Sequence, residues 1–107
     1  MELGLKGKVA VVTGGTQGIG RASALRFAQE GANVAICARN ADRLEQTAAE
    51  LRKTGVEVLS MSADCSRADD IERFIGAVVK KFGRLDVLVN NAEESQRGKF
   101  LETDDAK

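Results

Sequence analysis

A chain of 107 residues is long enough for one compact domain, and a hydrophobic content of 43% allows it a core. Its 16 basic and 16 acidic side chains cancel, so charge gives no reason to expect nucleic acid or an anionic membrane surface as a partner. No apolar run exceeds five residues and the amino terminus lacks the apolar segment of a signal peptide, so we expect no membrane span and a cytoplasmic location.

Residue types that are missing restrict the chemistry further. The chain contains no His, which excludes Ser-His-Asp and Cys-His catalytic arrangements and the common zinc sites, so we predict no metal site. It also contains no Tyr. Its two cysteines, Cys37 and Cys65, lie in or just after apolar runs, and we interpret both as small buried hydrophobic residues rather than as redox partners.

The chain begins with a predicted strand and helix on either side of a glycine-rich segment. The β-branched apolar run at 8–13 predicts a fully buried strand. A helical pattern follows over about 19–30, and Gly31 stands where a C-cap belongs. On the inner face of this helix we place Ala22, Leu25 and Ala28.

A second predicted strand and helix follow directly. The apolar run at 34–38 indicates another buried strand. Asn40 or Asp42 can cap the next helix, which ends near Gly55. The inner stripe of this helix consists of Leu44, Ala48 and Leu51.

The third predicted strand, at 56–62, alternates apolar and polar residues, which is typical of the edge of a sheet. Ser66 and Asp69 have the spacing of a capping box, and Gly83 stops the helix that follows. The apolar residues of this helix recur at steps of three and four: Ile71, Phe74, Ile75, Val78 and Phe82.

The order of the predicted elements indicates the fold. A fourth strand is predicted at 85–90, and Thr103 resembles the start of another helix. Strict alternation of strands and helices implies right-handed crossovers and a parallel sheet. We therefore predict an α/β fold with a doubly wound, Rossmann-type parallel sheet of order 3-2-1-4, truncated after about four strands. Residues 1–107 would form one dinucleotide-binding domain, incomplete at its C-terminal end, with its ligand crevice between the first and fourth strands.

The segment TGGTQGIG, residues 13–20, joins the first strand to the first helix. A P-loop would need Lys and Ser or Thr after Gly20, where Arg21 and Ala22 stand, and the Gly-x-Gly-x-x-Gly fingerprint fails on spacing. Glycines at 14, 18 and 20 remain: one at the strand exit, one where the backbone meets a ligand and one where the helix packs. A helix amino terminus cleared of side chains suits a pyrophosphate, so we favour phosphate binding over a tight turn that needs positive φ.

The residue that follows the second strand bears on the choice of coenzyme. Folds of this type place the residue that meets the adenosine ribose about twenty residues beyond the glycine loop. The positions here hold Ala38 and Arg39, so a guanidinium and no carboxylate is available to a 2′-phosphate. We therefore favour NADP(H) over NAD(H); the alternative is that Arg39 is an exposed loop cation.

Three motifs occur in order along the chain: TGGTQGIG at 13–20, ADCS at 63–66 and NNA at 90–92. With them, the chain resembles the short-chain dehydrogenase/reductase family over nearly all of its length. The resemblance implies that Asp64 accepts a hydrogen bond from the adenine amino group, that the Cys65 amide approaches the ring, and that Asn91 bonds only local backbone. The candidate cofactor-binding residues are Gly14, Thr16, Gln17, Gly18, Ile19, Gly20, Arg39, Asp64, Cys65, Asn90 and Ala92.

The chain departs from the family at two points. Glu93 stands where the family motif has Gly, and we expect weaker cofactor binding, by about 1–3 kcal/mol if the position needs positive φ. The family's catalytic Tyr, with a Lys four residues later, a Ser and an Asn, lies beyond the fourth strand, and this chain has no Tyr at all, so we assign no catalytic residue.

Two functions remain open. The first is the cofactor-binding half of an NADP(H)-dependent oxidoreductase that reduces a carbonyl or oxidises an alcohol by hydride transfer. The alternative is a non-catalytic chain that binds dinucleotide, or that associates with another copy through the unfinished edge of the sheet.

Overall fold

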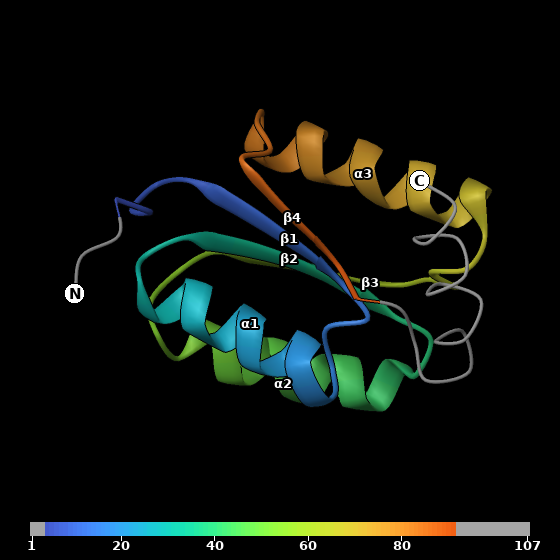
Figure 1. The fold of residues 1–107 in the computed structure, drawn as a ribbon, viewed down its shortest axis with the longest axis horizontal. Helices are drawn as coiled ribbons and strands as arrows, with labels where there is room; N and C mark the ends of the chain where they lie inside the picture. The colour runs from blue at the N-terminus through green and yellow to red at the C-terminus, as the bar shows by residue number, and fades with distance from the viewer. Residues whose placement is uncertain (1–3, 92–107) are drawn as a thin grey trace, which may run out of the picture.

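The computed structural model describes residues 4–91, which form four strands and three helices in strict alternation (Figure 1). The strands are β1 (Val9–Thr13), β2 (Asn33–Ala38), β3 (Val58–Ser62) and β4 (Val87–Asn90). The helices are α1 (Gly18–Gln29), α2 (Ala41–Arg52) and α3 (Ala68–Phe82). The predicted fold class is confirmed, because the sheet is parallel and its order is β3-β2-β1-β4.

The register of the sheet brings the carboxyl ends of all four strands to one edge. Thr13, the last residue of β1, lies opposite Cys37 on β2 and opposite Asn90 on β4. Cys37 in turn lies opposite Met61, one residue before the end of β3. The loops that follow the strands therefore gather at this edge, where parallel α/β sheets bind their ligands.

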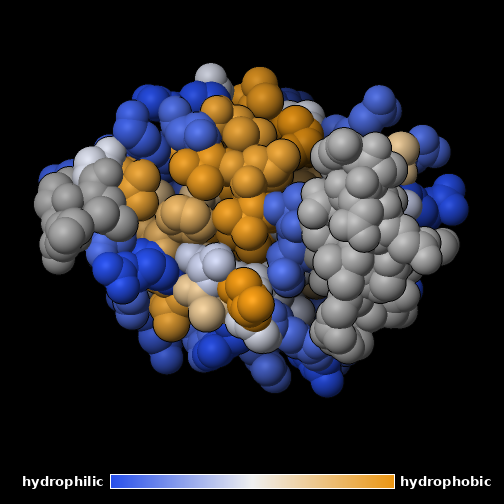
Figure 2. Space-filling model, viewed as in Figure 1, coloured by the Kyte–Doolittle hydropathy of each residue, from blue (hydrophilic) through white to orange (hydrophobic). Residues whose placement is uncertain are grey.

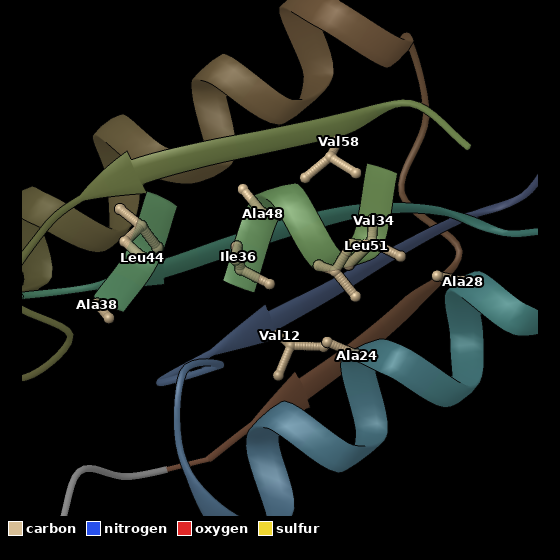
Figure 3. Close-up of a cluster of buried hydrophobic side chains, with 10 residues drawn as sticks. All are labelled: Val12, Ala24, Ala28, Val34, Ile36, Ala38, Leu44, Ala48, Leu51 and Val58. Carbon is tan, nitrogen blue, oxygen red and sulfur yellow. The ribbon is translucent and has the colours of Figure 1, made fainter. Parts of the chain in front are cut away.

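Two apolar cores sandwich the sheet, and Figure 1 shows α1 and α2 on one face and α3 on the other. The whole of β1 is buried, as its continuous apolar run predicts. Buried residues of the first core, drawn in Figure 3, are Val12, Ala24, Ala28, Val34, Ile36, Ala38, Leu44, Ala48, Leu51 and Val58. Those of the second core, beneath α3, are Val9, Val11, Ala35, Cys37, Ala63, Phe74 and Val78.

The inner face of α1 differs from the prediction. Its buried residues are Gly20, Ala24 and Ala28, whereas Ala22 is exposed, so placing Ala22 on the inner face was wrong. The true stripe has a spacing of four and consists only of the smallest side chains, which lets the helix axis approach β1 closely. Figure 3 shows Ala24 of α1 beside Val12 of β1.

The start of α3 also differs from the prediction. Asn40 caps α2 as expected, since its Oδ1 accepts the Arg43 N–H at 3.0 Å. The capping box at Ser66 is wrong: α3 begins one residue later, with Arg67 at the N-cap, and the Ser66 hydroxyl instead donates to Asp64 Oδ1 at 2.6 Å. The Ser66 side chain therefore bonds within the loop after β3 and does not cap α3. The helix start expected at Thr103 lies outside the described residues.

The surface around β4 is apolar. Figure 2 shows hydrophobic residues gathered over β4 and α3. The exposed large hydrophobic residues there are Val79, Leu85 and Leu88, and half or more of the surface of Val79 and of Leu88 is accessible. Within residues 4–91, none of the helices has the length and apolar character needed to cross a bilayer.

Candidate functional site

A glycine loop leaves the carboxyl end of β1 and turns directly into α1. Gly14 and Gly18 have φ angles of +67° and +52°, a region that side-chain-bearing residues rarely adopt. The Gly14 N–H donates to the Cys37 carbonyl at 2.8 Å, which fixes the loop to β2. No atom of the described residues lies within 4 Å of a Cβ built at Gly18, so the need for glycine there is conformational and not steric.

Two further glycines are held by close packing. A Cβ at Gly20 would collide with the Gly14 carbonyl oxygen and lie 2.7 Å from Asn91 Nδ2. A Cβ at Gly15 would lie 2.9 Å from the Ile36 side chain on β2. The need for glycine at position 15 was not predicted, because the spacing 14-18-20 does not include it and nothing in the sequence places Ile36 beside it.

The amino terminus of α1 is open to an anion. The helix begins at Gly18, and the first N–H groups of any helix have no acceptor within it. Within the described part of the chain, the Gln17 side chain makes no capping hydrogen bond and the first turn carries no acidic residue. The helix dipole adds partial positive charge at this point, so the turn can bind a phosphate oxygen through backbone groups alone.

The predicted residues around this turn differ in exposure. Thr16 is half-buried, whereas Gln17, Gly18 and Ile19 are exposed, and Ile19 exposes 75% of its surface. Arg21 stands where a P-loop would have Lys, and it is engaged with α2. Its guanidinium forms a bidentate ion pair with the Glu50 carboxylate, with a shortest N–O distance of 2.6 Å. A ligand at this loop would therefore meet backbone amides and an apolar side chain, and the loop itself contributes no cation.

Hydrogen bonds tie the glycine loop to the end of β4. The Thr13 hydroxyl donates to Asn90 Oδ1 at 2.9 Å and accepts the Asn91 N–H at 3.0 Å. The Asn91 side chain donates through Nδ2 to the Gly14 carbonyl at 3.2 Å. The Asn91 side chain thus bonds backbone, as the resemblance implies, although this backbone is 77 residues away in the sequence. The bond holds the glycine loop against the end of β4. Ala92 lies outside the described residues.

Arg39 and Asp64 lie just after the ends of β2 and β3. Hydrogen bonds from the Ser66 hydroxyl and N–H, at 2.6 and 2.9 Å, hold the pKa of Asp64 below its ordinary 3.8, and the positive charge of Arg39 acts in the same direction. The Asp64 N–H donates to the Asp70 carboxylate at 2.7 Å. Asp64 is therefore an ionised acceptor on a braced loop, and the exposed Arg39 is a cation in its neighbourhood.

Cys37, near the end of β2, and Cys65, after β3, contact one another through their sulfur atoms. Cys37 is buried, as expected, but Cys65 is half-buried and its Sγ is 3.1 Å from that of Cys37. The contact was not predicted from the sequence, because 28 residues separate the two cysteines. Residues 4–91 contain no cluster of His, Cys, Asp or Glu able to hold a metal ion.

Comparison with known proteins gives consistent matches. A family model described as short chain dehydrogenase matches residues 8–107. The short chain dehydrogenase/reductase dpchG of Colletotrichum higginsianum is 45% identical over 94 residues, which are 88% of this chain and 35% of that protein. The chain thus spans about a third of the length of this protein and of two ketoacyl reductases of Streptomyces that it also resembles.

Solved structures match equally well. L-sorbose reductase from Gluconobacter frateurii, complexed with NADPH and L-sorbose, is 44% identical with a TM-score of 0.83, covering 87% of this chain and 36% of that one. NAD+-bound xylitol dehydrogenase is 39% identical with a TM-score of 0.80, covering 83% of this chain and 34% of that one.

Proposed function

This chain belongs to the short-chain dehydrogenase family, and we propose that it supplies the cofactor-binding part of an NADP(H)-dependent oxidoreductase. The reaction would reduce a carbonyl or oxidise an alcohol, and the bound nicotinamide would supply or accept the hydride. The dinucleotide-binding domain would extend over residues 1–107, in the cytoplasm.

The glycine loop carries this proposal. A bare helix amino terminus, two glycines at positive φ and a loop fixed to both neighbouring strands form a rigid set of amides at the carboxyl edge of the sheet. We infer that the pyrophosphate binds the N–H groups around Gly18 and Ile19. Thr16, Gln17 and Asn90 would then border the phosphates and the neighbouring ribose, and Asp64 and the Cys65 amide would meet the adenine.

Arg39 supports NADP(H) over NAD(H). The comparisons include both an NADPH complex and an NAD+ complex, so the similarity alone does not decide between the coenzymes. Arg39 is exposed directly after β2, and a planar guanidinium suits a phosphate better than it suits a free 2′-hydroxyl. Asp64 follows β3, the neighbouring strand, and would bond the adenine amino group.

The proposal assigns no catalytic residue to this chain. Residues 1–107 contain no His, the side chain that titrates nearest neutral pH, and no Tyr, the proton donor that the family resemblance implies. We expect the 107-residue chain by itself to bind coenzyme without turning over a carbonyl substrate.

A second function, association with another copy without turnover, has one observation in its favour. Among the described strands β4 pairs only with β1, and its exposed Leu88 belongs to the apolar surface over β4 and α3. An edge of this kind recruits a further strand readily. Sedimentation of the chain with and without NADPH distinguishes the two, because a purely associating chain dimerises and takes up no coenzyme.

The test of the proposed function is a calorimetric titration of the chain with NADPH and with NADH. We expect NADPH to bind more tightly, and Arg39→Asp to narrow or reverse the preference by removing the cation and adding a charge that repels a 2′-phosphate. Arg43→Asp, an equal charge change at an exposed position in the first turn of α2, is the matched control and should leave the ratio unchanged. Tighter binding of NADH would contradict the coenzyme assignment, and no heat with either would overturn the site.

A further inference from the structure

The thiols of Cys37 and Cys65 meet at the carboxyl edge of the sheet. Cys37 belongs to β2 and exposes none of its surface, whereas Cys65 follows β3 and is half-buried. Their sulfur atoms are 3.1 Å apart, and the Cys65 thiol also lies 3.7 Å from the Cys37 carbonyl. A disulfide bond is about 2.05 Å long, so the two sulfurs need to approach by only about 1 Å to form one.

We propose that this pair is an oxidation site at which hydrogen peroxide forms a reversible disulfide. Cys65 is the sulfur that peroxide reaches first, because Cys37 is wholly covered. The Cys65 thiolate attacks one peroxide oxygen, the O–O bond breaks, and the leaving hydroxide takes up the thiol proton as water. The Cys37 thiolate then attacks the sulfur of the Cys65 sulfenic acid, the S–O bond breaks, and a second water leaves with the Cys37 proton. The two sulfurs give up two electrons and one peroxide is reduced.

The disulfide would alter both ends of the proposed coenzyme site, a consequence that rests on the proposed function. The Cys37 carbonyl accepts the Gly14 N–H at 2.8 Å, so Cys37 anchors the glycine loop. Asp64 immediately precedes Cys65, and its hydrogen bonds to Ser66 and Asp70 hold the loop after β3 in place. Drawing Cys65 toward β2 displaces that loop, so the oxidised chain binds dinucleotide more weakly than the reduced chain.

The disulfide is tested by peptide mapping of the chain after treatment with peroxide. Trypsin releases Cys37 in residues 27–39 and Cys65 in residues 54–67. We expect a linked pair of these peptides, lighter than their sum by two hydrogen atoms, from protein that runs as a monomer on a non-reducing gel, and we expect dithiothreitol to separate them. Cys37→Ala and Cys65→Ala must each abolish the link. Absence of the link, or its presence only in dimeric protein, overturns the proposal.

Titration with NADPH then tests the consequence. We expect oxidation to raise the Kd by roughly tenfold, as the loss of one or two hydrogen bonds to adenine would, and reduction to restore it. Cys65→Ala, which keeps the Cys65 amide, should bind NADPH equally before and after peroxide. A linked chain with an unchanged Kd refutes the coupling. Should the reduced chain bind no NADPH, the proposed function fails, while the peptide map still decides the disulfide on its own.

Discussion

Replacing Gly20 by Ala tests how the glycine loop is built. The added Cβ would overlap the Gly14 carbonyl oxygen and crowd Asn91 Nδ2, so the loop must move and the Asn91–Gly14 hydrogen bond is lost. The lost bond costs about 1 kcal/mol and the overpacking about 1–3 kcal/mol, whereas Ala gains about 1 kcal/mol over Gly in a helix. We expect the free energy of unfolding to fall by about 1–3 kcal/mol.

Urea denaturation followed by circular dichroism measures this change, and Gly76→Ala is the matched control. Gly76 is an exposed position inside α3, and a Cβ there meets no described atom within 4 Å. This control should raise the free energy of unfolding by about 0.5–1 kcal/mol through helix propensity alone. If Gly20→Ala stabilises the chain as Gly76→Ala does, the close approach of α1 to the loop is not what requires glycine at position 20.

Two other substitutions test the contacts between β1 and the β4 side of the sheet. Thr13→Val keeps the shape but leaves the Asn91 N–H without its acceptor, so urea denaturation should show a loss of about 1–3 kcal/mol; an unchanged midpoint would refute this. Hydrogen bonds from Arg84 and from the Val9 N–H hold the pKa of Asp86 below 3.8, so its contribution to stability is complete above about pH 5 and is lost as the pH falls through the folded-state value. In Asp86→Asn the free energy of unfolding should therefore fall less steeply as the pH is lowered below about 5. The same steepness in both proteins would contradict a contribution from the Asp86 carboxylate.

The architecture was predictable because local signals agree with one another. The continuous apolar run of β1 predicted its burial on both faces, and the polar alternation before Ser62 predicted β3 at the sheet edge. Because strands and helices alternate strictly, the crossover connections must be right-handed, and only a few strand orders are then possible. The error at Ala22 arose because a spacing of three and a spacing of four both fit α1, and only packing against Val12 selects the second.

The details of the site depend on contacts that no local pattern records. Asn91 is 77 residues from Gly14, and the sequence shows only that it is a polar residue after a strand. The sequence alone gives no reason for a glycine at position 15; the reason is the Ile36 side chain, which leaves no room for a Cβ there. Ser66 and Asp69 have a capping-box spacing, but Asp64 competes for the Ser66 hydroxyl and the helix begins later. For Asn91 and Gly15 the deciding partner is distant in the sequence, whereas for Ser66 it is an acceptor two residues away that competes with the cap.

In the proposed site, backbone groups of the glycine loop bind the pyrophosphate, whereas a side chain, that of Arg39, selects the coenzyme. The loop is shaped by backbone atoms and by glycines packed against Asn91 and Ile36, so changes there alter the fold and the affinity together. Arg39 is exposed, so its replacement should cost little stability while changing the charge that a 2′-phosphate meets. Affinity for any dinucleotide should therefore fall in step with stability for loop variants, whereas Arg39 variants should change the NADPH-to-NADH ratio at constant stability.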